Sequence, residues 1–188
     1  MAINLKKGDS LQISLKNLIV GLGWRTNDGE EVDLDASAFM LAANGRIPQD
    51  EYFVFYNNLE SPDHSVRSSG DDRSGGSNAG SDSDDESLYV NLEVINPQIK
   101  EIIFVVSIYE AKDRKQNFGS VHDAYMRIVD VDTNKELVRY QLEEDFSTVT
   151  IVEFGKLRKN GNAWNFEAMG EGYNKELDYL VNKYVVWL

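Results

Sequence analysis

The sequence feature that most constrains the fold is a series of short apolar segments with strand periodicity. About ten segments alternate apolar and polar residues or are rich in β-branched and aromatic residues, and turn-forming residues separate them. They read LQISL, LIVGLGW, VDLDASAFML, EYFVFY, LYVNLEV, EIIFVVSIY, AYMRIVDV, ELVRYQL, TVTIVEFGKL and AWNFEAM. Strands of this number and spacing predict a mostly β protein with an antiparallel β-sandwich. The 188 residues fit one domain over residues 1–188.

Two kinds of local pattern refine this architecture. Residues 132–135 (DTNK) and 160–162 (NGN) are typical of tight hairpin turns. Residues 51–56 (EYFVFY) and 102–109 (IIFVVSIY) are apolar on both faces. Strands of that kind are normally covered on each side, so both segments are expected to be central strands.

The last 16 residues, YNKELDYLVNKYVVWL, change from strand periodicity to helical periodicity. Leu177, Leu180, Val181 and Tyr184 follow the i, i+3, i+4, i+7 spacing that places side chains on one face of a helix. We therefore expect a C-terminal helix that packs on the sandwich.

Charge and composition exclude several classes of function. The formal net charge is −13 at pH 7, and an acidic surface repels phosphate backbones, so we expect no nucleic-acid partner. The chain has no cysteine, which excludes disulfides, thiolate metal sites and a cysteine nucleophile. No signal peptide is recognisable, and no apolar run approaches the roughly 18 residues of a membrane span. The sequence therefore predicts a cytoplasmic protein without a transmembrane segment.

The most unusual segment is residues 70–86, GDDRSGGSNAGSDSDDE, which places six carboxylates among glycines and serines. It lies within residues 61–87, the longest stretch without strand or helix periodicity, and a loop of that length is normally functional or disordered. On composition alone two interpretations stay open. The segment is either a solvated acidic tether or a site that binds something positive.

Carboxylates also occur at the entrance of an upstream strand. In VDLDASAFML, strand alternation puts Asp33, Asp35 and Ser37 on one face. From Phe39 onward that face is apolar, so the two aspartates are expected at the rim of the core. Carboxylates this close repel each other unless a cation or hydrogen-bond donors offset their charge. The pair therefore favours the binding-site interpretation.

The donor atoms near these aspartates suit calcium. Asn57 and Asn58 end the segment EYFVFYNN, and Asp63 follows in a Ser-Pro-Asp turn. Calcium takes six to eight oxygens from carboxylates, amides, backbone carbonyls and water. Zinc and copper prefer histidine and cysteine ligands, and this chain has two histidines and no cysteine. An EF-hand beginning at Asp82 does not fit, because Ser87 occupies the required glycine position and a strand follows.

Several long blocks resemble the TerD family of tellurite-resistance and stress-response proteins. The blocks are LIVGLGW, VDLDASAFML, FVFYNNLESPD, GDDR…SDDE, FGSVHDAYMRIVD and AWNFEAMGEGY, in this order over nearly the whole chain. The resemblance implies a β-sandwich that binds Ca²⁺, two or more ions, through acidic loops. It also implies partners among other stress and tellurite-resistance proteins, including at the inner face of the membrane.

The resemblance and the residue types together give one set of candidate metal ligands. This chain departs from the family where Asp72 replaces an asparagine, Ser68 replaces a frequent histidine, and the acidic tether is longer. The longer tether leaves open which of its later aspartates reach a metal. The candidates are Asp33, Asp35, Asn57, Asn58, Asp63, Gly70, Asp71, Asp72, Asp82, Asp84, Asp85 and Glu86.

Three functions fit such a site. The first is a calcium-binding stress-response protein that acts without catalysis, as a metal-dependent interaction or signalling module. The second is a metal-independent acidic scaffold that binds basic peptides, and the third is a metal-dependent phosphoesterase. His64 is expected in a solvated turn and His122 half-buried at a strand edge, and neither falls in a triad or zinc spacing. We therefore expect that the protein is not an enzyme.

Overall fold

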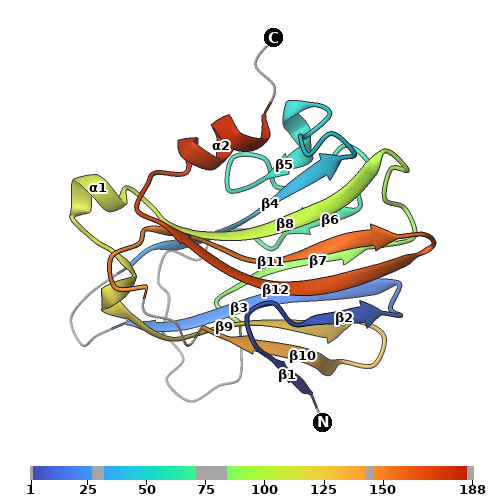
Figure 1. Ribbon diagram of the computed structural model, residues 1–188, viewed down its shortest axis with the longest axis horizontal. Helices are drawn as coiled ribbons and strands as arrows, with labels where there is room; N and C mark the ends of the chain where they lie inside the picture. Colours follow the sequence, from blue (N-terminus) through green and yellow to red (C-terminus); the bar gives the residue numbers. More distant parts are fainter. Residues whose placement is uncertain (1, 27–31, 71–83, 143–145, 186–188) are drawn as a thin grey trace.

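The computed structural model describes residues 2–26, 32–70, 84–142 and 146–185 (Figure 1). The strands of these residues form two six-stranded sheets that pack face to face, as the sequence predicts. All ten expected segments contain a strand, and two three-residue strands, β1 and β6, add to them. The pairing is antiparallel throughout except between β1 and β10, which run parallel.

Sheet A has the order β1, β10, β9, β3, β7, β6. Its strands are β1 (Ile3–Leu5), β10 (Lys135–Gln141), β9 (Val121–Asp130), β3 (Asn17–Thr26), β7 (Glu86–Asn91) and β6 (Val66–Ser68). Sheet B has the order β2, β12, β11, β8, β4, β5. Its strands are β2 (Ser10–Ile13), β12 (Ala163–Tyr173), β11 (Ile151–Asn160), β8 (Ile99–Ile108), β4 (Leu34–Ala42) and β5 (Phe53–Val54).

Two hairpins form where the sequence predicts them. β9 and β10 are joined through residues 131–134, and β11 and β12 through residues 161–162. Asn134 and Gly161 have φ of 52° and 59°, the left-handed conformation that asparagine and glycine adopt most readily. The turn residues thereby set the register of both strand pairs.

The C-terminal helix is α2 (Asp178–Tyr184), and it lies on the outer side of sheet B (Figure 1). Leu180 and Tyr184 are buried, and the Tyr184 ring contacts the Phe39 ring of β4 at 5.1 Å. This confirms the predicted helix. One further short helix, α1 (Ala111–Arg114), and two 3₁₀ turns, η1 (Asp50–Tyr52) and η2 (Phe118–Ser120), occur in the connections.

The prediction that residues 51–56 form a central strand is wrong. β8 is central, between β11 and β4, but β5 is the edge strand of sheet B and pairs with only two residues of β4. The apolar character of residues 51–56 has another cause. Phe53 stacks between Phe39 and Phe55, with ring centroids 4.1 and 4.4 Å apart, so aromatic packing covers one face of this segment, and the core buries Val54 on the other.

The strand order brings distant carboxylates to one end of the sandwich, which we call the acidic end. Here β3 ends at Thr26, β4 begins at Leu34 and β7 begins at Glu86. Leu22 of β3 pairs with Glu86, and Leu34 pairs with Ile108 at the end of β8. Asp33, Asp35 and residues 84–86 therefore belong to neighbouring strand ends.

Candidate metal centre

The aspartates at the entrance of β4, Asp33 and Asp35, are half-buried and buried, respectively. Asp33 directly precedes the strand, and its backbone carbonyl accepts a hydrogen bond from the Tyr109 N–H at 2.9 Å. Asp35 lies opposite Ser107 of β8 and is only 7% exposed. Its side chain lines a cavity of about 470 Å³ on the outer side of sheet B, with Ser107 and Tyr56 among the other lining residues.

Ser37 continues the same face of β4, as strand alternation predicts. Its side chain is 1% exposed, and within the described chain the hydroxyl oxygen has no hydrogen-bond partner. Buried polar groups normally have a partner, because leaving one unsatisfied costs about 1–3 kcal/mol. The Ser37 hydroxyl is therefore a buried polar group, close to Asp35, that a bound ligand could satisfy.

Residues 84–86, which we call the acidic stem, lead into β7, and each of their carboxylates has a different protein partner. Asp84 Oδ1 accepts hydrogen bonds from Arg127 Nε at 2.7 Å and from the Tyr125 hydroxyl at 3.1 Å, both on β9. Burial raises the pKa of the Asp84 carboxyl, and the Arg127 and Tyr125 donors offset part of that effect. Burial and the Asp84 charge together raise the pKa of Tyr125 to about 12.

Asp85 and Glu86 are hydrogen-bonded to backbone N–H groups of two other strands. Asp85 Oδ2 accepts from the Trp24 N–H of β3 at 2.9 Å, and the Asp85 N–H donates to the Leu22 carbonyl at 2.8 Å. Glu86 Oε2 accepts from the Ala36 N–H of β4, in the opposite sheet. The acidic stem is thus fixed to β9, β3 and β4 within three consecutive residues.

The other sequence-predicted ligands have separate places. Asn58 closes the turn after β5, where its side-chain nitrogen donates to the carbonyls of Glu51 and Phe53 at 2.9 and 2.7 Å. Asn57 is exposed in the same turn, whose neighbouring Tyr56 forms part of the cavity wall beside Asp35.

Asp63 lies at the opposite end of β7 from Glu86. Its carboxylate accepts hydrogen bonds from the Ser61 and Ser65 hydroxyls at 2.7 Å, from the Ser65 N–H at 3.0 Å and from the Asn96 N–H at 2.8 Å. Burial opposes the shift, but these donors together lower the pKa of Asp63. Asp63 thus closes a turn, apart from the carboxylates of the acidic end.

Three of the predicted ligands, Asp71, Asp72 and Asp82, lie outside the described residues. Gly70 is described, with φ of 101°, next to Ser69, whose N–H donates to the Ser87 carbonyl. Within the described ranges no group of three or more histidine, aspartate or glutamate side chains is arranged to hold a metal ion. The described carboxylates of the acidic end therefore supply at most part of a coordination shell.

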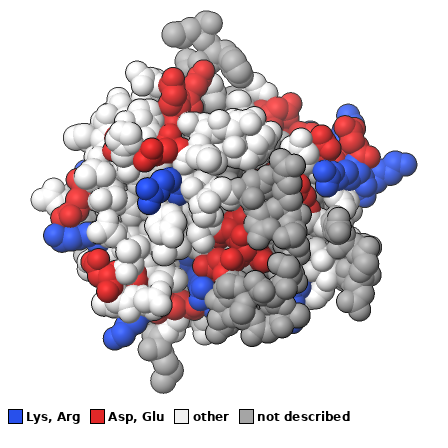
Figure 2. Space-filling model, turned by 180° about the vertical axis from the view of Figure 1, so that it is seen from behind, with Lys and Arg blue, Asp and Glu red and all other residues white. Residues whose placement is uncertain are grey.

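Sequence reasoning missed the basic partner of the acidic stem. Arg127 lies on the outer face of sheet A, and its side chain also contacts Glu136 of β10 at 3.2 Å. The segment AYMRIVDV shows only a polar residue at an alternating position, and nothing in it identifies Asp84 as the partner. Figure 2 shows acidic side chains gathered near the centre of the face opposite to that of Figure 1, with basic side chains beside them.

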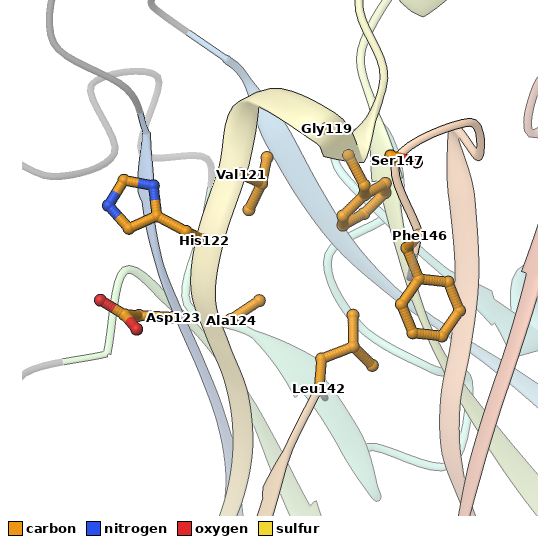
Figure 3. A pocket seen from close by; sticks show the side chains of 9 residues that line it. Gly119, Val121, His122, Asp123, Ala124, Leu142, Phe146 and Ser147 are labelled. Atoms are coloured by element: carbon orange, nitrogen blue, oxygen red, sulfur yellow. The ribbon is translucent and has the colours of Figure 1, made fainter. Parts of the chain in front are cut away.

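The histidines have no catalytic arrangement in the described structure. His64 is exposed in a turn with φ of 59°, as expected, but His122 is exposed rather than half-buried, because it is the second residue of β9 and lies near the end of the sheet. It borders a cavity of about 220 Å³ (Figure 3). In that view His122 and Asp123 point to one side of the strand, and Leu142, Phe146 and Ser147 lie on the other.

Not one of the described helices has the length and apolar character that a bilayer crossing requires. The charged side chains on α2, which include Asp178 and Lys183, agree with a surface position.

The chain is similar to known proteins over nearly its whole length. The TerD domain model matches residues 1–184. Tellurium resistance protein TerD from Alcaligenes sp. is 47% identical over 180 residues, which cover 92% of each chain. General stress protein 16U from Bacillus subtilis (strain 168) is 42% identical over 192 residues, which cover 98% of this chain and 97% of that protein.

A solved structure shares the fold. The crystal structure of a homologue of telluride resistance protein (TerD), SCO6318 from Streptomyces coelicolor A3(2), superposes with a TM-score of 0.71. The alignment covers 89% of this chain and 95% of that chain at 22% sequence identity. The two-sheet sandwich is therefore common to both.

Proposed function

This chain belongs to the TerD family, and from that premise we propose that it is a calcium-binding resistance protein that acts without catalysis. One observation carries the proposal. Asp33 and Asp35 lie two residues apart at the entrance of β4, and the Glu86 carboxylate reaches the Ala36 N–H directly after Asp35, although like charges repel. A fold that concentrates negative charge in this way favours a bound cation.

The donor atoms at the acidic end fit a hard cation. They are carboxylate oxygens of Asp33 and Asp35 and the hydroxyl oxygen of Ser37, which has no partner in the described chain. Calcium accepts such ligands in flexible numbers and geometries. Asp33 and Asp35 would hold the ion, and the predicted ligands Asp71, Asp72 and Asp82 lie outside the described residues. When bound, the ion supplies the positive charge that offsets the repulsion between these carboxylates.

The proposed link to resistance is indirect. Relatives carry the names of tellurium resistance and general stress proteins. Reduction of tellurite by the protein itself would ordinarily require thiols, and this chain has no cysteine. We therefore propose that cation binding fixes a surface that other stress or tellurite-resistance proteins recognise, in the cytoplasm and including the inner face of the membrane.

Calorimetric titration of chelator-stripped protein with CaCl₂, beside MgCl₂, tests the proposal. We expect calcium to bind more tightly than magnesium, and the double variant Asp33→Asn/Asp35→Asn to lose that binding. The matched control is Glu93→Gln/Asp132→Asn, which removes the same charge at the far end of β3, where Lys16 pairs with Glu93 at 2.8 Å.

The possible results separate the three functions. Equal loss of binding in both double variants would reveal a diffuse charge effect in place of a site. An absence of heat from wild-type protein would contradict calcium binding and favour the metal-independent scaffold. Hydrolysis of a phosphoester by the calcium-loaded protein, abolished by Asp33→Asn/Asp35→Asn, would favour the phosphoesterase.

A further inference from the structure

We propose that Arg127 is a positioning residue for the acidic end: its guanidinium holds Asp84 on sheet A and thereby fixes where Asp85 and Glu86 place their carboxylates. Arg127 Nε lies 2.7 Å from Asp84 Oδ1, and the two side chains are only 17% and 9% exposed. A charge-assisted hydrogen bond of this length, shielded from water, is among the stronger polar contacts a protein makes. The expected change in calcium affinity rests on the proposed function, whereas the positioning of the acidic stem by Arg127 does not.

The surface of sheet A is shaped to receive Asp84. Gly21 of β3 lies beneath its carboxylate, and a Cβ added at Gly21 would come within 1.9 Å of Asp84 Oδ2. A Cβ at Gly23 would similarly meet the Tyr125 ring at 2.4 Å, and the hydroxyl of that ring donates to Asp84. The two glycines thus form a shallow trough that only residues without a side chain can provide. Asp84 is seated in a defined place.

A second set of contacts fixes the guanidinium itself. Arg127 Nη1 donates to Glu136 Oε2 at 3.2 Å, and Glu136 is held in turn by Arg139 through two hydrogen bonds of 2.8 and 2.7 Å. The Arg139 guanidinium lies 4.2 Å from the centroid of the Tyr125 ring. Asp84, Arg127, Glu136 and Arg139 thus form a continuous network of ion pairs in which each charge is next to an opposite one. Arg127 is therefore held between the carboxylates of Asp84 and Glu136.

This anchor has a direct consequence for the rest of the acidic stem. Asp85 follows Asp84 immediately and connects to β3, and Glu86 connects to β4 of the other sheet. Moving Asp84 out of its trough would pull on both hydrogen bonds, because only one residue separates the anchor from Glu86. The hydrogen bonds described for the Trp24 and Ala36 N–H groups go to Asp85 and Glu86. Arg127 therefore acts on them through Asp84.

The test compares Arg127→Gln and Arg127→Lys with the control Arg158→Gln. Arg158 pairs with Glu101 at 2.5 Å on sheet B, so its loss changes the net charge equally without touching the acidic stem. Hydrogen exchange of metal-free protein reports the N–H groups of Trp24, Ala36 and Asp85. Calorimetry with CaCl₂, at a temperature where circular dichroism shows the folded state, reports cation affinity.

We expect Arg127→Gln to speed exchange of these three amides and to weaken calcium binding by about tenfold, the lower range for groups that position metal ligands. Arg127→Lys keeps the charge and loses the planar fork, so both effects should be smaller. Electrostatics alone predicts the opposite sign, since removing a positive charge strengthens cation binding, and Arg158→Gln should show that small gain. Unchanged exchange, or an affinity that rises as in the control, would overturn the inference.

Two further outcomes keep the inference and the proposed function apart. If wild-type protein binds no calcium, the proposed function fails, and the exchange measurement still decides whether Arg127 positions the acidic stem. If Arg127→Gln does not fold, the Arg127→Lys variant decides: wild-type exchange rates together with wild-type affinity would contradict positioning by the guanidinium fork.

Discussion

Glu86 of sheet A accepts a hydrogen bond from the backbone N–H of Ala36 in sheet B, so one carboxylate joins the two layers of the sandwich. The edge strand β5 pairs with β4 only at Ala38 and Phe39, two and three residues further along. Among the described residues, Glu86 supplies the acceptor that β5 does not extend far enough to provide. The contact is buried, since Glu86 is 4% exposed.

The first prediction concerns this contact. Glu86→Ala should lower the free energy of unfolding by about 1–3 kcal/mol, because the buried Ala36 N–H loses its acceptor. Glu86→Gln keeps an acceptor oxygen and should cost less. Urea denaturation of metal-free protein measures both. Glu93→Ala, at an exposed glutamate, is the control, and equal losses in Glu86→Ala and Glu93→Ala would show that the contact between sheets contributes nothing.

A second prediction concerns the trough beneath Asp84. Gly21→Ala should destabilise the protein by about 1–3 kcal/mol, because the added Cβ would displace the Asp84 carboxylate from Arg127. Asp84→Ala removes the displaced group, so the double variant Gly21→Ala/Asp84→Ala should be more stable than the sum of the two single losses predicts. Thermal and urea unfolding measure the four proteins of this cycle. Simple additivity would place the cost of Gly21→Ala elsewhere.

Much of the fold follows from periodicity in the sequence. Each of the ten apolar segments became a strand, and Asn134 and Gly161 marked the hairpins through their preference for positive φ. The strands β1 and β6 were not predicted, because three residues are too few to show alternation. The position of β5 was not predictable for another reason. The stacking of Phe53 on Phe39 and Phe55 covers one face of this edge strand and the core buries Val54 on the other, so the sequence resembles that of a central strand.

The candidate site was predictable only in part. Strand alternation placed Asp33, Asp35 and Ser37 on one face, since that pattern is local. The role of Asp84 was not predictable, because its partner Arg127 lies 43 residues away and reaches it only through the order of strands in sheet A. A list of acidic residues does not show which carboxylates are held by arginine or by backbone N–H groups.

The third prediction concerns alkaline pH. Glu153 of β11 is buried and accepts hydrogen bonds from the hydroxyls of Tyr173 and Tyr184 and from Lys183. Burial and then this carboxylate raise the pKa of both tyrosines above the ordinary value of about 10. Above pH 10 the unfolded chain releases these protons and the folded chain keeps them, so stability should fall as pH rises.

Tyr184→Phe provides the test of that assignment. Without the Tyr184 hydroxyl, the decline of the unfolding free energy between pH 10 and 11 should flatten by up to about 1.4 kcal/mol per pH unit. Urea unfolding at pH 8, 9, 10 and 11 gives the slope for each protein. Tyr89→Phe, at an exposed tyrosine of β7, is the control and should leave the slope unchanged. Parallel slopes for wild type and Tyr184→Phe would contradict the assignment.

The last prediction concerns the effect of calcium on thermal stability. Free calcium at a hundredfold excess over its dissociation constant should add about 2.7 kcal/mol to the unfolding free energy, if the unfolded chain does not bind it. For a chain of this length that gain corresponds to a rise in Tm of about 5–11 °C.

Calorimetric scans with CaCl₂ and with chelator measure the rise. Asp33→Asn/Asp35→Asn should melt at the same temperature in both conditions, and in chelator it should melt no lower than wild type, because it has lost two repelling charges. Glu93→Gln/Asp132→Asn should keep the full rise. If the calcium effect survived in Asp33→Asn/Asp35→Asn, the ion would have to bind away from the entrance of β4, and the remaining carboxylates of the chain would be the place to look.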